Sequence, residues 1–279
     1  MHQDQIHNLR KMAFDVRRHI LTMSTRGGCF VGASFSCTDI LICLYQYFLN
    51  ISKSNLQNPG RDYFFLSKGH AAPALYGVLA ESGLISKDHL NNHLSPNDHI
   101  YLHPNPNIPG IEFHSGSLGH MLPLAVGVAI DCKRQKTNNR VVVVTGDGEL
   151  NEGSNWEALL TAQAYKLDNM IIITDRNQLQ ANVPTEDLIP LEKLEDKFAA
   201  FGCGVTRIDG HDFEIINNTL TSVPFGKSKP SAIIAETVRG KGIPSMESRT
   251  DKWFMQPTVE EASELMREME KNWSNGVMG

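Results

Sequence analysis

Two oxygen-bearing side chains, Asp147 and Asn177, each follow a short apolar run that ends abruptly in a polar loop. Residues 141–144 are all valine and residues 171–173 are all isoleucine, and such unbroken β-branched runs are typical of parallel strands buried on both faces. Carboxylate and amide oxygens are the hard ligands that Mg²⁺ prefers. Because the carboxyl ends of parallel strands meet at one edge of a sheet, we expect both side chains there, around a divalent cation.

Glycines on both sides of Asp147 make room for a bulky anion beside that cation. Gly146 and Gly148 carry no side chain, so the backbone can come close to a ligand. A helix is predicted to follow, and the amide groups at its N-terminus attract phosphate. A Gly-Asp-Gly sequence alone is more often a simple turn, and Asp-x-Asn after a strand is usually a solvated loop. Two such loops on consecutive buried strands instead predict a site for a divalent metal and a diphosphate.

The elements that must position these loops alternate between strand and helix. Strands are predicted over residues 140–145, 170–174, 205–208 and 231–238, and helices over residues 4–24, from 36 or 38 to about 48, 70–82, 119–133, 154–166 and 213–220. Residues 95–116, rich in Pro, His and Asn, form a long loop of the kind that often binds ligands. The predicted fold class is α/β, a mostly parallel sheet with helices on both faces, in a single domain over residues 1–279.

The composition argues against several classes of protein. With 279 residues, 41% of them hydrophobic, the chain can bury a sizeable core without disulfides. A net charge of -5 and the lack of a dense basic stripe argue against nucleic-acid binding. No apolar stretch approaches the roughly 20 residues of a membrane span, and the polar N-terminus does not resemble a signal peptide. The five cysteines lack a CxxC spacing, which argues against zinc and a disulfide framework and favours a cytoplasmic protein.

Four sequence blocks together resemble the thiamine-diphosphate-binding half of transketolase. In chain order they are LSKGHAAPALYG at 66–77, GIEFHSGSLGH at 110–120, GDGELNEGSNWEA at 146–158 and DRNQLQ at 175–180. The resemblance covers roughly residues 15–255 and implies a thiamine-diphosphate-binding fold of the diphosphate-binding type. It implies thiamine diphosphate and Mg²⁺, or another divalent cation such as Ca²⁺ or Mn²⁺, as cofactors. The implied reaction transfers a two-carbon ketol unit from a ketose donor to an aldehyde acceptor, with sugar phosphates as substrates.

The resemblance also implies roles for individual positions. It implies that Asp147, Asn177 and the backbone carbonyl of Leu179 bind the metal. The residues that it implies for cofactor binding are Lys68, His70, Gly116, Leu118, Asp147, Gly148, Glu149, Asn177, Leu179 and Arg239. The catalytic residues that it implies are His70, His103, which matches a histidine facing the substrate hydroxyls, and Glu152.

Glu152 and Glu157 stand at the start of a predicted helix, where an exposed carboxylate is the ordinary interpretation. In the family such glutamates form a buried network that links two active sites across a dimer, so the resemblance favours that role. The chain ends where the family's second, pyrimidine-binding domain begins, and the resemblance therefore implies a partner subunit that carries this domain. We expect two copies of each chain, joined through large apolar interfaces, and no activity of this chain alone.

Two positions depart from the family pattern. Phe30 stands where most transketolases have a histidine that contacts the transferred unit, and Phe254 replaces a second active-site histidine. Each change exchanges a hydrogen-bonding ring for an apolar one. Either the site takes an atypical donor or acceptor, or the chain is a non-catalytic structural partner; the intact metal loops favour an enzyme. Other thiamine-diphosphate reactions, a 1-deoxyxylulose-5-phosphate synthase-like condensation or a 2-oxo acid decarboxylation, are further alternatives.

Overall fold

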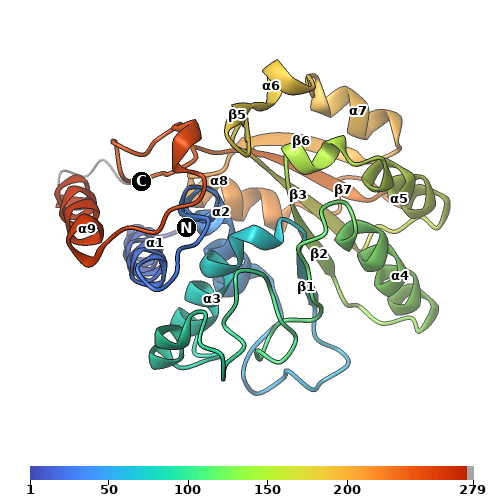
Figure 1. Cartoon of the computed structure of the whole chain (residues 1–279). Helices are drawn as coiled ribbons and strands as arrows, with labels where there is room; N and C mark the ends of the chain where they lie inside the picture. Colours follow the sequence, from blue (N-terminus) through green and yellow to red (C-terminus); the bar gives the residue numbers. More distant parts are fainter. Residues whose placement is uncertain (275–279) are drawn as a thin grey trace.

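A parallel five-stranded sheet runs through the computed structural model, which describes residues 1–274 of the chain (Figure 1). Its strands lie side by side in the order β1-β2-β3-β7-β6. They are β1 (Tyr63–Leu66), β2 (Val141–Gly146), β3 (Met170–Arg176), β7 (Ser231–Glu236) and β6 (Gly204–Asp209). A short antiparallel pair, β4 (Leu179–Gln180) and β5 (Val183–Pro184), follows β3 outside this sheet.

Helices cover both faces of the sheet because successive strand residues point to opposite sides. Val142 and Val144 of β2 belong to one buried apolar cluster, and Val141 and Val143 belong to a second. The first cluster includes residues of α1 (Gln3–Ser24), α2 (Val31–Cys43), α3 (Ala72–Glu81) and α8 (Phe213–Thr221). The second includes residues of α4 (Met121–Arg134), α5 (Gly153–Ala164) and α7 (Leu194–Ala200). Helix α6 (Thr185–Leu188) follows β5, and α9 (Val259–Ser274) lies beside α1 (Figure 1).

The register of the sheet brings the carboxyl ends of its strands to one edge. Gly146, at the end of β2, pairs with Asp175 of β3, and Arg176 pairs with Glu236 at the end of β7. Leu66, which ends β1, pairs with Val144. The loops that follow β1, β2, β3 and β7 therefore meet at the same edge.

Helix α2 has no exposed face, and all of its residues are buried. It begins at Val31, earlier than the predicted start at residue 36 or 38, and it continues into a π-helical turn over Leu44–Phe48. The predicted start rested on polar residues, which often cap helices. Here the hydroxyls of Ser36 and Thr38 instead bond to carbonyls of the preceding turn, at 3.0 and 2.9 Å, so both residues lie inside the helix.

The α/β fold class and its parallel sheet are confirmed. All four predicted strands are present, and residues 95–116 contain no helix or strand, as expected. The sequence analysis did not predict β1, α7 and α9; β1 is only four residues long, too short for a clear pattern. Among residues 1–274, no helix combines the length and the apolar character needed to cross a bilayer.

Candidate active site

Four neighbouring strand ends bring several of the predicted site residues to one edge of the sheet. Lys68 follows β1, Asp147 follows β2, Asn177 follows β3 and Arg239 lies shortly after β7. All four residues are buried, with exposed fractions of 1%, 2%, 8% and 2% in that order. Buried charges and amides need partners, so the contacts of each group determine what the site can hold.

The charged centre of this edge is an ion pair between Lys68 and Asp175. Asp175 is completely buried, and it also accepts hydrogen bonds from the hydroxyls of Ser36, at 2.6 Å, and Thr237. The Lys68 ammonium donates a further bond to the carbonyl of Ala33 at 3.0 Å. Burial by itself raises the pKa of Asp175, but the charge of Lys68 and the hydrogen bonds from Lys68, Ser36 and Thr237 together outweigh burial, and the net pKa lies below its ordinary value. The structure therefore places the predicted cofactor residue Lys68 on an internal carboxylate.

The Asp147 carboxylate is held from three directions. Its Oδ1 accepts the N–H of Gly148 at 2.8 Å, and its Oδ2 accepts the N–H of Gln178 at 2.6 Å and Nη1 of Arg176 at 3.1 Å. Burial raises the pKa of Asp147, the nearby charge of Asp175 raises it further, and Arg176 offsets only part of this rise. A bound cation would stabilise the ionised form of Asp147 because it would relieve the repulsion between two buried carboxylates.

The other two predicted metal ligands lie on the turn after β3. Gln178, whose N–H reaches Asp147, has a left-handed backbone with φ 66°. The side-chain oxygen of Asn177 accepts the N–H of Leu179 at 3.1 Å, and the carbonyl of Leu179 accepts Nη2 of Arg239 at 2.8 Å. The Asn177 and Leu179 oxygens each keep a free lone pair. Together with the Asp147 carboxylate they fit a hard cation, whose remaining coordination positions phosphate and water would fill. No group of three or more His, Cys, Asp or Glu suited to a metal occurs in the described part of the chain.

Glu149 is buried, and its carboxylate points toward hydrogen-bond donors of the chain itself. It accepts the N–H groups of Gly119 at 2.9 Å and Gly146 at 3.0 Å, and the hydroxyl of Ser67. Burial raises the pKa of Glu149, and these hydrogen bonds oppose the rise. Because the three donors come from the loop after β1, the last residue of β2 and the loop before α4, Glu149 fixes the ends of β1 and β2 and the start of α4 relative to one another. Only its backbone remains for a contact with a diphosphate.

Gly116 and Leu118 lie in the loop before α4, which passes over the turn after β1. Gly116 has φ 140°, and a Cβ built on it would lie 2.8 Å from Cδ2 of His103, so the position accepts only glycine. A Cβ on Gly69 would lie 2.6 Å from the hydroxyl of Ser115. This hydroxyl is buried without a hydrogen-bond partner among the described residues, which leaves a polar group available to a ligand.

Five rings form an aromatic wall, defined by Phe30, His70, His103, Trp253 and Phe254. Phe30 lies at its centre, with centroid distances of 4.9 Å to Trp253, 5.2 Å to Phe254, 5.5 Å to His70 and 6.3 Å to His103. Burial lowers the pKa of His70 to about 3 and also lowers that of His103. Both imidazoles are therefore neutral near pH 7, and each offers one hydrogen-bond donor and one acceptor. Phe30 and Phe254, the two departures from the family pattern, lie in direct contact.

Glu152 and Glu157 are both exposed in this chain, at the N-terminal end of α5. They do not join the rings of the aromatic wall. Helices α4 and α5 border an open groove lined by apolar side chains that include Val126, Ile130 and Ala158. Leu160 of α5 is 57% exposed. An apolar groove and an exposed large apolar side chain on the same helix are typical of an interaction surface.

Arg176 is a site residue that the sequence analysis missed. Its guanidinium, 2% exposed, pairs with Asp147 at 3.1 Å, Glu186 at 2.6 Å and Glu192 at 3.2 Å. It therefore anchors a predicted metal ligand to the segment that follows β5. The only signal in the sequence is a cation at the polar end of an apolar strand, between Asp175 and Asn177.

The family model described as "Transketolase, thiamine diphosphate binding domain" matches residues 1–268. The chain belongs to the transketolase family. Its relatives include a subunit of the apulose-4-phosphate transketolase of Actinobacillus succinogenes, which is 41% identical over 265 residues, or 94% of this chain and 95% of that one. The "6-deoxy-6-sulfo-D-fructose transketolase subunit SqwG" of a Clostridium species is 36% identical over 242 residues, or 86% of this chain and 88% of that one.

Solved transketolases have the same fold. The enzyme from Campylobacter jejuni matches with a TM-score of 0.88 at 26% identity, over 98% of this chain and 43% of that structure. The one from Leishmania mexicana matches in fold with a TM-score of 0.84 at 23% identity, over 94% of this chain and 41% of that structure. The chain thus spans about two fifths of these two transketolases. The predictions of a thiamine-diphosphate-binding α/β domain and of a transketolase-like transferase are confirmed.

The ion pair at the centre of this transketolase-family chain predicts a large stability effect. Lys68→Met leaves Asp175 buried without its cation, so we expect the free energy of unfolding in urea to fall by about 3–5 kcal/mol. The matched control Lys133→Met, which breaks a partly exposed pair with Asp168, is expected to cost about 0–1 kcal/mol. Equal losses for the two variants would contradict the central role of the buried pair.

The same variant has a predictable pH dependence. The pKa of Asp175 is lowered in the folded chain, so the stability from its charge is complete above the ordinary pKa of about 3.9 and is lost as pH falls toward the folded value. In Lys68→Met the pKa of Asp175 should instead lie above its ordinary value, because an unpaired buried carboxylate takes up a proton more readily. The difference in unfolding free energy between parent and variant, measured in urea at several pH values, should therefore shrink in acid.

Metal binding tests the oxygen cluster directly. Asp147→Asn keeps the shape of the side chain and removes its charge, so we expect calorimetric titration to show Mg²⁺-dependent binding of thiamine diphosphate weakened by about 100-fold or more. Asp187→Asn, an exposed carboxylate on α6, is the matched control and should bind like the parent. Unchanged binding by Asp147→Asn would exclude Asp147 as a metal ligand.

Proposed function

We propose that the chain is the metal- and diphosphate-binding subunit of a two-chain transketolase that transfers a two-carbon ketol unit from a ketose donor to an aldehyde acceptor. The observation that carries this proposal is the cluster of Asp147, Asn177 and Leu179 oxygens, which fits a hard cation. The relatives named as transketolase subunits have nearly the same length as this chain, since the matches cover 95% and 88% of them.

Each group of the site then has a part in binding. Asp147, Asn177 and the carbonyl of Leu179 would hold the divalent cation, and the backbone of Gly148, with His70 and Arg239, would hold the diphosphate. Bound thiamine diphosphate supplies a nucleophilic thiazolium carbon for the two-carbon unit. His103 and His70, both neutral, accept and donate hydrogen bonds to substrate hydroxyls without adding charge to the site.

The partner in this proposal is a pyrimidine-binding subunit, two copies of it with two of this chain. The apolar groove between α4 and α5 and the exposed Leu160 of α5 support an interface on these helices. Glu157 lines this groove and Glu152 caps the start of α5, so a neighbouring subunit on this surface would bury them and give them a part in catalysis. A cytoplasmic location is supported by five free, buried thiols.

Substrate choice follows from the aromatic wall. Phe30 and Phe254 present apolar surface where a histidine would offer a hydrogen bond. The pocket therefore has fewer hydrogen-bonding groups that require a substrate hydroxyl as partner. We infer a ketose phosphate or aldehyde acceptor that lacks a hydroxyl, or carries a bulkier apolar surface, at the carbon that faces Phe30. The relatives include enzymes named for unusual sugars, apulose 4-phosphate and 6-deoxy-6-sulfofructose.

The assembly is tested with the two chains together. Co-expressed with the pyrimidine-binding subunit and supplied with thiamine diphosphate and Mg²⁺, the chain should consume a ketose phosphate donor, whereas the chain alone should not. Asp147→Asn should abolish turnover in the complex without dissociating it, because Asp147 does not line the groove between α4 and α5. Turnover by the purified chain alone would overturn the two-chain proposal.

The role of the aromatic wall is tested by replacing Phe30 with a residue that can form hydrogen bonds. Phe30→His should raise kcat/KM for a fully hydroxylated ketose phosphate relative to its 4-deoxy analogue by about tenfold, since an unpaired buried imidazole disfavours the deoxy compound. Phe30→Leu keeps the position apolar and should leave the ratio unchanged. An unchanged ratio in Phe30→His would mean that Phe30 does not face the substrate.

A further inference from the structure

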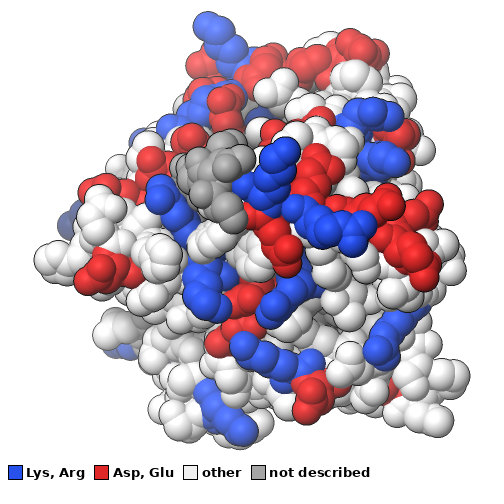
Figure 2. Space-filling model, turned by 90° about the vertical axis from the view of Figure 1, so that its left-hand side faces the viewer, with Lys and Arg blue, Asp and Glu red and all other residues white. Residues whose placement is uncertain are grey.

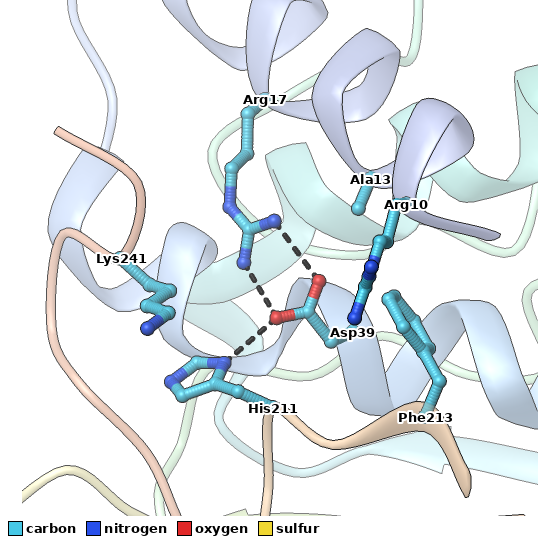
Figure 3. Close-up of a pocket in the computed structure, with 7 residues that line it drawn as sticks. All are labelled: Arg10, Ala13, Arg17, Asp39, His211, Phe213 and Lys241. Carbon is cyan, nitrogen blue, oxygen red and sulfur yellow. Dashed lines mark hydrogen bonds and ion pairs between the residues drawn. The ribbon is translucent and has the colours of Figure 1, made fainter. Parts of the chain in front are cut away.

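His211 lies in the loop between β6 and α8, where its buried ring meets side chains of α1 and α2 (Figure 3). Neither the metal ligands nor the aromatic wall include this residue. Its ring nevertheless reaches the backbone that leads to the candidate active site, because the N–H of Val238 donates to Nε2 at 2.8 Å. Val238 directly precedes Arg239, so His211 holds the neighbour of a predicted cofactor-binding residue.

The carboxylate of Asp39 fixes which nitrogen of the His211 ring carries a proton. A backbone N–H can only donate, so Nε2 accepts from Val238, and the proton lies on Nδ1, which donates to Asp39 at 2.7 Å. Arg17 holds the same buried carboxylate through two hydrogen bonds, at 2.9 and 2.8 Å. Burial raises the pKa of Asp39, but Arg17 and His211 outweigh it and hold the pKa at about 2. The ionised carboxylate therefore keeps the acceptor of the ring directed at Val238.

The loop that carries His211 packs closely on the segment after β7. The N–H of Gly210 donates to the carbonyl of Glu236 at 2.7 Å. A Cβ on Gly210 would lie 2.5 Å from Cγ2 of Thr237, so the two backbones approach as closely as a glycine allows. With the loop docked in this way, the position of the imidazole determines the position of the Val238 N–H.

Arg239 extends from the segment after β7 to the turn after β3. Its buried guanidinium donates from Nη2 to the carbonyl of Leu179 at 2.8 Å, and from Nη1 to the carbonyl of Ala181. A Cβ on Gly32 would lie 2.8 Å from Cγ of Arg239, so helix α2 also restricts the side chain. The guanidinium can reach these carbonyls only if its backbone leaves Val238 in the right direction.

We propose that His211 is a positioning residue, whose Nε2 holds the backbone of Val238 so that the guanidinium of Arg239 can meet a bound diphosphate. This inference rests on the proposed function, in which Arg239 binds the diphosphate and the carbonyl of Leu179 binds the metal. Without the acceptor, the N–H of Val238 loses its partner and the segment shifts to find another. A misplacement of about 1 Å is enough to impair a site of this kind.

Calorimetric titration of the full chain with thiamine diphosphate, in excess Mg²⁺, tests the proposal. His211→Leu removes the acceptor and should weaken binding by about 3- to 10-fold, the equivalent of one hydrogen bond. The variant should still fold, because Asp39 keeps its pair with Arg17; urea unfolding checks this. His211→Gln supplies an amide oxygen with a similar reach and should restore most of the affinity. The matched control is His19→Leu, which removes a partly buried histidine that pairs with Glu81 at 2.8 Å between α1 and α3, and it should bind like the parent.

A double-mutant cycle separates positioning from a general loss of stability. In an Arg239→Met background His211 has no guanidinium left to position, so His211→Leu should weaken binding no further. A second measurement needs no cofactor. In the free chain, the amide of Val238 should exchange with solvent faster in His211→Leu than in the parent, and His211→Gln should slow this exchange again.

The outcomes distinguish this inference from the function on which it rests. Parent-like binding by His211→Leu, or a loss that adds in full to that of Arg239→Met, would overturn the inference alone. Unchanged exchange of the Val238 amide in His211→Leu would overturn it as well. Unchanged binding by both Arg239→Met and Asp147→Asn would contradict the proposed function, and this inference with it.

Discussion

The buried ion pair between Lys68 and Asp175 is the interaction on which the carboxyl edge of the sheet depends. It joins the loop after β1 to the end of β3, and the hydroxyls of Ser36 and Thr237 add α2 and the segment after β7 to the same carboxylate. The charge of Asp175 also raises the pKa of Asp147, so the pair influences how the adjacent oxygen cluster responds to a cation. One internal carboxylate thus sets both the geometry and the electrostatic character of the candidate site.

The central part of the fold could be predicted because its signals are local. The valines of β2 and the isoleucines of β3 are buried on both faces of the sheet, and such strands read as unbroken apolar runs. The start of α2 could not be placed, because Ser36 and Thr38 resemble capping residues and their burial against the sheet is visible only in three dimensions. Strand β1 is too short to show a period, although it positions Lys68.

The site was predictable in the same uneven way. Asp147 and Asn177 are marked by their place after apolar strands, and the family resemblance supplied Leu179. The contacts that restrain these predicted ligands come from residues distant in sequence, so the anchoring of Asp147 by Arg176 and the inward orientation of Glu149 became visible only in the folded chain. The charge pattern of the surface does not point to the site. Figure 2 shows basic and acidic side chains interspersed over the face in view, in agreement with the lack of a basic stripe in the sequence.

Helix α2 has a consequence for how substrate preference can diverge among related enzymes. None of its residues is exposed to solvent, so a mutation between Val31 and Cys43 alters folding before it alters substrate choice. Phe254 belongs to the aromatic wall but is 40% exposed, on a segment without strand neighbours in the sheet. Mutations that change substrate specificity are therefore better tolerated in the C-terminal segment than in α2. Directed evolution of such an enzyme has most freedom at position 254.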